Sequence, residues 1–199
     1  MLDNAKARAG IAGAIEPIAR GLLRVGLSAD AVTWIGAAAV VADSVFVIAR
    51  GHFLLGATIY GLLSLSDLLD GTMARISGTS GPWGAFLDST LDRIVDAAVL
   101  ISITIYFVNE PTHSWVVPAT LVALAMGQIT SYIRARAEAV GADCHVGIAE
   151  RAERSLILWI AMTVTGFGYN VLPAAIALLA IVSTITVAQR IVHVRKQLA

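Results

Sequence analysis

Five aspartates lie close together in this chain, and their spacing places four of them on two helix faces. Asp67 and Asp70 are three residues apart and Asp88 and Asp92 are four apart, so each pair shares one face of a helix. Carboxylates gathered at one site repel each other unless protons or cations neutralise them. All-oxygen ligands favour hard cations such as Mg²⁺, Mn²⁺ or Ca²⁺, and pairs of such ions recur in phosphoryl chemistry. The pattern predicts a two-metal centre.

Helix caps and Asp–Arg ion pairs are the alternative interpretation of these aspartates. Asp88 lies near an expected helix start and Asp92 precedes an arginine, so each suits such a role. Two matching pairs favour the metal site, because isolated caps or ion pairs do not require that spacing. Asp96 continues the second face one turn deeper, and we expect it to support the site or to be structural.

The segment between the two pairs, ISGTSGPWG at residues 76–84, predicts a loop because it is rich in Gly, Ser and Pro. If the flanking helices are antiparallel neighbours, Asp67 and Asp92 each lie roughly 12 Å from their loop ends, at about 1.5 Å of rise per residue. All four carboxylates would then meet at a similar depth.

The helices that carry these aspartates are expected to lie in a membrane. The chain is 57% hydrophobic and only 14% charged, and its mean hydropathy is +0.78. Apolar runs recur with short interruptions and, with their flanks, reach the ~20 residues that cross a bilayer. We expect an all-α integral membrane protein with six transmembrane helices at Leu27–Ile48, Phe53–Leu69, Ala97–Val108, Trp115–Met126, Leu156–Tyr169 and Val171–Val187.

Basic residues predict the orientation of the six spans. Nearly all of the 14 Lys and Arg residues lie at the termini or in the second-to-third and fourth-to-fifth connections, with Arg50 as the exception. The positive-inside rule places that face, with both termini and the aspartates, on the cytoplasmic side of the cell membrane.

The first 26 residues predict an amphipathic helix that lies in the membrane interface. Its apolar face is formed by Ile11, Ile15, Ile18 and Leu22, and Lys6, Arg20 and Arg24 lie off that face. Packing on the cytoplasmic ends of the bundle is the alternative. We therefore expect a single membrane domain over residues 1–199, with a juxtamembrane helix at 1–26 and a six-helix bundle at 27–199.

The aspartate stretch has the form D-x2-D-G-x2-A-R-x8-G-x3-D-x3-D. The pattern is filled by Asp67, Asp70, Gly71, Ala74, Arg75, Gly84, Asp88 and Asp92. It resembles the signature of the CDP-alcohol phosphotransferases, membrane enzymes of phospholipid synthesis, at every fixed position. The resemblance implies a six-helix homodimer that uses two divalent cations, Mg²⁺ or Mn²⁺, to displace CMP from a CDP-linked lipid with an alcohol.

Roles for individual residues follow from this resemblance. The four aspartates of the motif would be the metal ligands, and Asp92 would also be the general base that takes the proton of the acceptor hydroxyl. The CDP-lipid would be held by Gly71 and Ala74, which let it approach the helix, by Arg75, which can pair with a phosphate, and by Ser80 and Gly81 of the loop. The segment LSADAVTWIG resembles a family segment that contacts cytidine, which implies roles for Asp30 and Thr33.

Arginines near the cytoplasmic ends of the later spans predict a second anion site. Arg134, Arg154 and Arg190, with Arg151 nearby, come from three segments and would suit an acceptor that carries its own phosphate. The alternative is a positively charged fringe paired with Glu138, Glu150 and Glu153. The stretches IEPIARGLLRVGLSADAVT, SYIRARAEA and ERAER resemble actinobacterial phosphatidylinositol phosphate synthases, which join CDP-diacylglycerol to inositol 1-phosphate.

Two other functions are compatible with the same sequence. A phosphatidylglycerophosphate synthase would also need a phosphorylated acceptor, glycerol 3-phosphate. A cation or proton-coupled transporter would use the same aspartates, but it leaves the spacing of Gly71, Ala74 and Arg75 unexplained. We expect substrates and the lipid bilayer as partners, and no nucleic acid.

Overall fold

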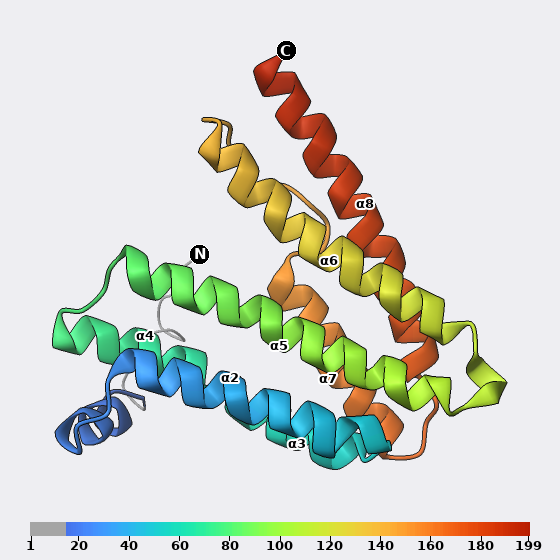
Figure 1. The fold of residues 1–199 in the computed structure, drawn as a ribbon, viewed down its shortest axis with the longest axis horizontal. Coiled ribbons are helices and arrows are strands. Elements are labelled where there is room, and N and C mark those ends of the chain that lie inside the picture. The colour runs from blue at the N-terminus through green and yellow to red at the C-terminus, as the bar shows by residue number, and fades with distance from the viewer. Residues whose placement is uncertain (1–14) are drawn as a thin grey trace, which may run out of the picture. The chain divides into compact units, whose positions relative to one another are not determined.

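The structure is a computed structural model that describes residues 15–199, and this part of the chain is helical without strands (Figure 1). Residues 15–24 form a helix. It is followed by α2 (Ala29–Phe46), η1 (Ile48–Arg50), α3 (Phe53–Leu63), α4 (Ser66–Ser77), α5 (Pro82–Val108), η2 (Pro111–His113), α6 (Val116–Ala139), α7 (Arg151–Gly166) and α8 (Leu172–Leu198). The predicted all-α fold is confirmed.

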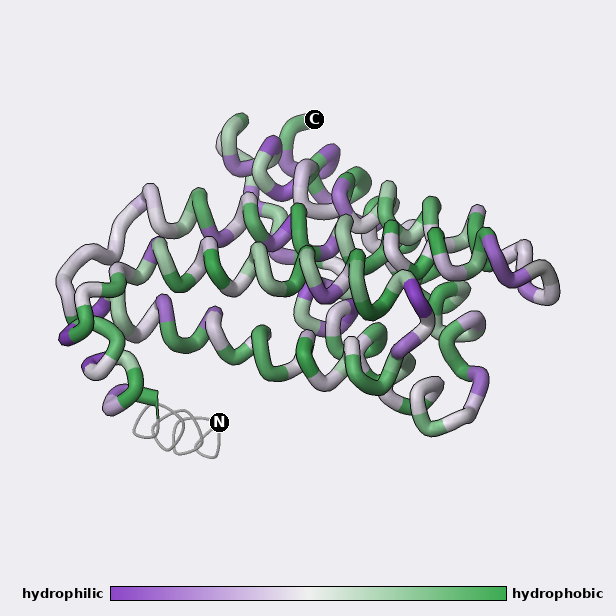
Figure 2. Tube along the Cα trace, turned by 60° about the horizontal axis from the view of Figure 1, so that its bottom comes forward, coloured by the Kyte–Doolittle hydropathy of each residue, from purple (hydrophilic) through white to green (hydrophobic). Residues whose placement is uncertain are grey.

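Within the described residues, four helical stretches are long and apolar enough to cross a membrane: Ala29–Arg50, Phe53–Ser77, Val116–Ala139 and Leu172–Leu198. Apolar residues cover much of the length of the helices in Figure 2. The other two predicted spans coincide with α5, whose first half carries the charged motif, and with α7, which has 16 residues. The protein is thus a membrane-type helical protein, and the count of six spans stays a prediction.

The chain forms two compact units, one from residues up to Ala42 with Ile59–Val95, the other from Asp43–Thr58 with Asp96–Ala199. The first unit contains all four motif aspartates. In it, α2 and α4 approach so closely that a Cβ on Gly36 would lie 2.5 Å from Ser66 Oγ. A larger side chain at this crossing would push α2 away from the helix that carries Asp67 and Asp70.

The helix before the motif is broken at Ser64 and Leu65, which separate α3 from α4. Ser64 Oγ donates to Tyr60 O at 2.9 Å and Ser66 Oγ donates to Leu63 O at 2.6 Å. Serine hydroxyls that bond back to helix carbonyls bend helices. The sequence predicted one uninterrupted span here, and the structure places a break that ends two residues before Asp67.

The connection between α4 and α5 is shorter than predicted. Gly78 ends α4 in the left-handed conformation (φ 69°), and α5 already begins at Pro82. Proline suits the first turn of a helix because its missing N–H is not needed there. Trp83 and Gly84 are therefore helical, and only residues 78–81 form the loop that joins the two antiparallel helices (Figure 1).

The described part of the N-terminal segment, helix 15–24, packs on the first unit through one of its faces. Ala19 is fully buried with Ala29 and Met73, and Leu22 packs against this cluster. Ile18, predicted for the apolar face that lies in the membrane interface, is 55% exposed. Helix 15–24 therefore packs on α2 and α4, and its place in the membrane interface stays a prediction. Ile11 and Lys6 lie outside the described residues.

In the second unit, α6 and α8 form the most extensive helix pair, and they run side by side in the same direction (Figure 1). The end of α7 touches the start of α3, where a Cβ on Gly166 would lie 2.4 Å from Leu54 N. Trp159 also fixes these helices, because its Nε1 donates to Ala57 O at 2.8 Å.

Candidate functional site

Asp70 is the most enclosed of the four motif aspartates. It is 8% exposed, and its Oδ2 accepts a hydrogen bond of 2.6 Å from Thr33 Oγ1 on α2. It also lies close enough to Asp88 and Asp30 for electrostatic interaction with both carboxylates. Within the first unit, Asp70 on α4 therefore lies near one acidic residue of α2 and one of α5.

The other three aspartates of the motif differ in exposure. Asp67 and Asp88 are exposed, and Asp92 is half-buried, with its Oδ2 3.5 Å from Arg93 Nη1. Among residues 15–199, no three His, Cys, Asp or Glu side chains are arranged as a metal cluster. The metal assignment therefore stays a prediction.

The donor chemistry and the surroundings of the motif fit divalent cations. The four candidate ligands offer only carboxylate oxygens, which hard cations prefer. A Cβ on Gly71 or Gly84 would meet no atom within 4 Å, so space lies open beside both helices of the motif.

Arg75 lies along α4, where its Nε donates to Gly71 O at 3.1 Å and its Nη2 to Thr72 Oγ1 at 3.0 Å. Its side chain is exposed, so the guanidinium lies next to the open side of Gly71. Ala74 instead packs against the cluster that contains Met73. Of the two small residues predicted to let a nucleotide approach, Gly71 borders open space and Ala74 contributes to the core.

A contact that the sequence did not predict joins α2 to α5. Trp83 Nε1 donates to Asp30 Oδ2 at 2.9 Å, so the side chain of Asp30, in the first turn of α2, is tied to the start of α5. The sequence signal was a tryptophan within the predicted loop, because an indole N–H can donate a hydrogen bond. Ser80 and Gly81 are exposed in the loop itself, as predicted.

The second unit holds all four predicted acceptor arginines, and two of them are buried. Arg190 is 3% exposed; its Nε donates to Val146 O at 2.8 Å and its Nη1 to Thr130 O at 2.7 Å. Its Nη2 lies 3.5 Å from Glu150 Oε1. Arg154 donates from Nη1 to Ala149 O at 3.0 Å. Both guanidinium groups are therefore fixed by backbone carbonyls of the α6–α7 connection.

The other two arginines form ion pairs. Arg134 Nε donates to Glu138 Oε1 at 3.0 Å, one turn along α6. Arg151 Nε lies 3.5 Å from Asp96 Oδ1. The pairs with Glu138 and Glu150 correspond to the alternative interpretation of these arginines. The partner of Asp96, which the sequence left open, is thus an arginine of the predicted acceptor group.

The connection that fixes the buried arginines is itself tied along α8, and we call residues 143–149 the strap. Gln197 brackets Asp143, accepting from its N at 2.9 Å and donating to its O at 2.6 Å. Gln189 Oε1 accepts from Ile148 N at 3.1 Å, and Thr186 Oγ1 accepts from Ala149 N at 3.3 Å. Side chains of α8 therefore satisfy the backbone of a loop that has no regular structure of its own.

Cys144 anchors the strap on its inner side. The thiol is fully buried and packs in a cluster with Ala137 and Ala142. Burial raises the pKa of this thiol above its ordinary value, so it stays protonated. A buried, protonated thiol is a poor nucleophile, and Cys144 is a packing residue.

Gly147→Ala is expected to lower the free energy of unfolding by roughly 1–3 kcal/mol. Gly147 has φ +138°, and an added Cβ would lie 2.4 Å from Thr186 Cγ2. The matched control is Gly141→Ala, where φ is +83° but no atom lies within 4 Å. Thermal unfolding followed by circular dichroism should show a larger loss for Gly147→Ala. Equal losses would contradict the close approach of the strap to α8.

Known proteins resemble this chain over most of its length. The chain matches the CDP-alcohol phosphatidyltransferase family over residues 27–193. The phosphatidylinositol phosphate synthase of Cutibacterium acnes is 39% identical over 198 residues, which cover 95% of this chain and 96% of the relative. The enzyme of the same name from Mycobacterium marinum is 42% identical over 188 residues, 92% of this chain and 80% of the relative.

Solved structures show the same similarity. The crystal structure of Mycobacterium tuberculosis phosphatidylinositol phosphate synthase with CDP-DAG bound has a TM-score of 0.86 and 40% identity, covering 90% of this chain and 92% of that one. The same enzyme in complex with manganese and citrate has a TM-score of 0.85 and 40% identity, covering 91% and 88%. With a family match over most of its length and relatives of this similarity, the chain belongs to the CDP-alcohol phosphatidyltransferase family.

Proposed function

We propose that this enzyme transfers the phosphatidyl group of CDP-diacylglycerol to inositol 1-phosphate, giving phosphatidylinositol phosphate and CMP. The observation that carries the proposal is the complete family motif on α4 and α5, with Asp70 and Asp88 near each other. The names of the relatives and the CDP-DAG in a related crystal structure support the lipid donor and the acceptor.

The reaction needs a group that accepts the proton of the acceptor hydroxyl, and positive charge that offsets the negative charge of the donor phosphates. Asp67, Asp70, Asp88 and Asp92 would hold two divalent cations, Mg²⁺ or Mn²⁺, which supply positive charge to the phosphates of the donor. The manganese in a related structure supports this choice. Asp92 accepts the proton of the acceptor hydroxyl as its oxygen bonds to the phosphatidyl phosphorus, and the bond from that phosphorus to CMP breaks.

Residues around the motif would hold the donor. Thr33 fixes the Asp70 carboxylate through its hydrogen bond, and Asp30 and the exposed loop residues Ser80 and Gly81 border the expected cytidine site. Arg75 lies beside the open flank of Gly71, where its guanidinium can reach a phosphate.

Steady-state CMP release tests the acceptor. Purified protein is given CDP-diacylglycerol and Mg²⁺ with inositol 1-phosphate, with glycerol 3-phosphate, or with no acceptor. Of these three reactions, we expect CMP release only in the one that contains inositol 1-phosphate. Turnover with glycerol 3-phosphate instead would assign a phosphatidylglycerophosphate synthase, and cation flux in proteoliposomes without lipid turnover would assign a transporter.

Arg154→Ala and Arg190→Ala are expected to raise the KM for inositol 1-phosphate about ten- to a hundredfold, because each loses a charge-assisted contact worth roughly 1.5–3 kcal/mol. Binding of CDP-diacylglycerol should be nearly unchanged. Arg134→Lys should have a milder effect, since the charge is kept.

The two arginine substitutions also remove hydrogen bonds to carbonyls of the strap. A displaced strap could by itself raise the KM, so a control for this effect is needed. Gln189→Leu is the matched control: it removes a strap hydrogen bond but no positive charge. An equal rise in KM for Gln189→Leu, or a loss of CDP-diacylglycerol binding in the arginine variants, would contradict an acceptor-phosphate site.

We further propose six membrane spans, a homodimer in the plasma membrane and an active site on the cytoplasmic face. The arginine-rich ends of α6, α7 and α8 support this orientation through the positive-inside rule. A cysteine introduced at Ser80 should be labelled by a membrane-impermeant thiol reagent only after the cells are permeabilised. One introduced at Thr112 should be labelled in intact cells, and the reverse pattern would contradict the orientation.

A further inference from the structure

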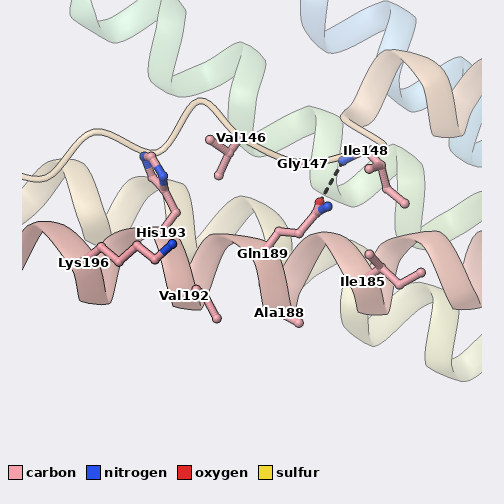
Figure 3. Close-up of a pocket in the computed structure, with 9 residues that line it drawn as sticks. All are labelled: Val146, Gly147, Ile148, Ile185, Ala188, Gln189, Val192, His193 and Lys196. Carbon is pink, nitrogen blue, oxygen red and sulfur yellow. Dashed lines mark hydrogen bonds between the residues drawn. The ribbon is translucent and has the colours of Figure 1, made fainter.

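A groove of about 640 Å³ runs along the last part of α8 under the strap (Figure 3). One wall is a stripe of α8 residues at helical spacing: Ile185, Ala188, Gln189, Val192, His193 and Lys196. The other wall is the strap at Val146, Gly147 and Ile148. The groove lies wholly within the second unit, and neither the motif nor the predicted acceptor site includes these residues.

The wall formed by the strap is fixed rather than free. Gln189 spans the gap to Ile148 N, as the dashed line in Figure 3 shows, and Arg190 holds Val146 O at 2.8 Å from the buried side. Gly147 lies against Thr186 so closely that no side chain fits between them. The groove is therefore part of the folded unit and does not need a ligand to form it.

The groove is apolar along most of its length. The side chains of Ile148, Ile185 and Val192 are 54%, 41% and 52% exposed. Ile185 and Val192 belong to α8, which is apolar enough to cross a membrane. These exposed aliphatic side chains can pack against the hydrocarbon chain of a lipid.

One end of the groove is cationic. His193 and Lys196 lie together at the end nearer the C-terminus, while Ile148 and Ile185 lie at the other (Figure 3). Lys196 brings an ammonium group with three N–H donors and His193 a ring N–H donor, and no acidic residue lines the groove. Basic pockets beside transmembrane helices bind anionic lipid headgroups at the membrane surface.

We propose that this groove is a binding site for an anionic phospholipid of the surrounding bilayer. One acyl chain lies along Ile148, Ile185 and Val192, and the phosphate meets Lys196 and His193. The inference concerns a resident lipid and is independent of the donor and acceptor of the reaction. Because the bound lipid would cover the strap, it also shields the hydrogen bond between Gln189 and Ile148 from water.

Native mass spectrometry of the protein released from nanodiscs tests the proposal. Nanodiscs contain equal amounts of phosphatidylglycerol and phosphatidylcholine, and the retained lipid is counted. We expect phosphatidylglycerol to be retained preferentially. Lys196→Gln should reduce the preference about fivefold, which corresponds to the roughly 1 kcal/mol of one cation at a membrane surface, and the double variant with His193→Gln should abolish it.

Arg195→Gln is the matched control, because Arg195 is the neighbouring exposed cation of α8 but does not line the groove. It should leave lipid retention unchanged. Ala188→Trp, which fills the apolar part, should displace both lipids; if that variant does not fold, the charge variants alone decide.

Three results would overturn the proposal. They are equal retention of the two lipids by the unaltered protein, equal losses for Lys196→Gln and Arg195→Gln, and conversion of a dimer to a monomer by Ala188→Trp without loss of lipid. The last result would assign the groove to contact with a second copy of the chain.

Discussion

Asp92→Asn is expected to lower turnover by about 10²- to 10⁴-fold, the range typical of a lost general base. The side chain keeps its size but can no longer accept the proton of the acceptor hydroxyl, and it binds a cation less well. Asp92 is half-buried on α5 beside Arg93, and the isosteric change should leave the fold and most of the CDP-diacylglycerol binding intact. CMP release and lipid binding, measured on the same preparation, separate these effects.

Asp96→Asn is the control for this result, since it changes the next carboxylate on the same helix. Asp96 is paired with Arg151 at 3.5 Å, and loss of a partly exposed ion pair costs about 1 kcal/mol or less. Turnover should therefore fall by less than about tenfold. If Asp92→Asn released CMP at a near-normal rate, the assignment of the base would be wrong.

Removal of divalent cations is expected to abolish turnover completely. If the four carboxylates of α4 and α5 form one site, they cannot all remain ionised without positive counter-charge. Excess EDTA should stop CMP release, and added Mg²⁺ or Mn²⁺ should restore it. Asp67→Ala and Asp70→Ala should reproduce the loss of activity in the presence of Mg²⁺.

Asp70 distinguishes a metal effect from a structural one. Because Asp70 is buried and bonded to Thr33, Asp70→Ala also removes a hydrogen bond between α4 and α2. It should therefore lower the free energy of unfolding more than Asp67→Ala, which changes an exposed residue. Undiminished turnover in excess EDTA would refute the metal site for both residues.

Much of the fold and the position of the site follow from local sequence patterns. Apolar runs predicted helices that the structure confirms, because a backbone in lipid must satisfy its own hydrogen bonds and a helix does so within one segment. The i, i+3 and i, i+4 spacing placed the aspartates on two helix faces, and the eight-position motif indicated the family that the comparisons show. These are properties of neighbouring residues, which the sequence records directly.

Only the tertiary structure decided which of these faces meet and what holds the charged side chains. Thr33 and Asp70 are 37 residues apart, and their pairing depends on the close crossing of Gly36 and Ser66. The sequence likewise identified Arg154 and Arg190 but not the strap carbonyls that fix them. The spacing of residues in the sequence indicates which face of a helix is apolar or charged. Which other helix or loop that face contacts depends on the packing of segments that are distant in the chain.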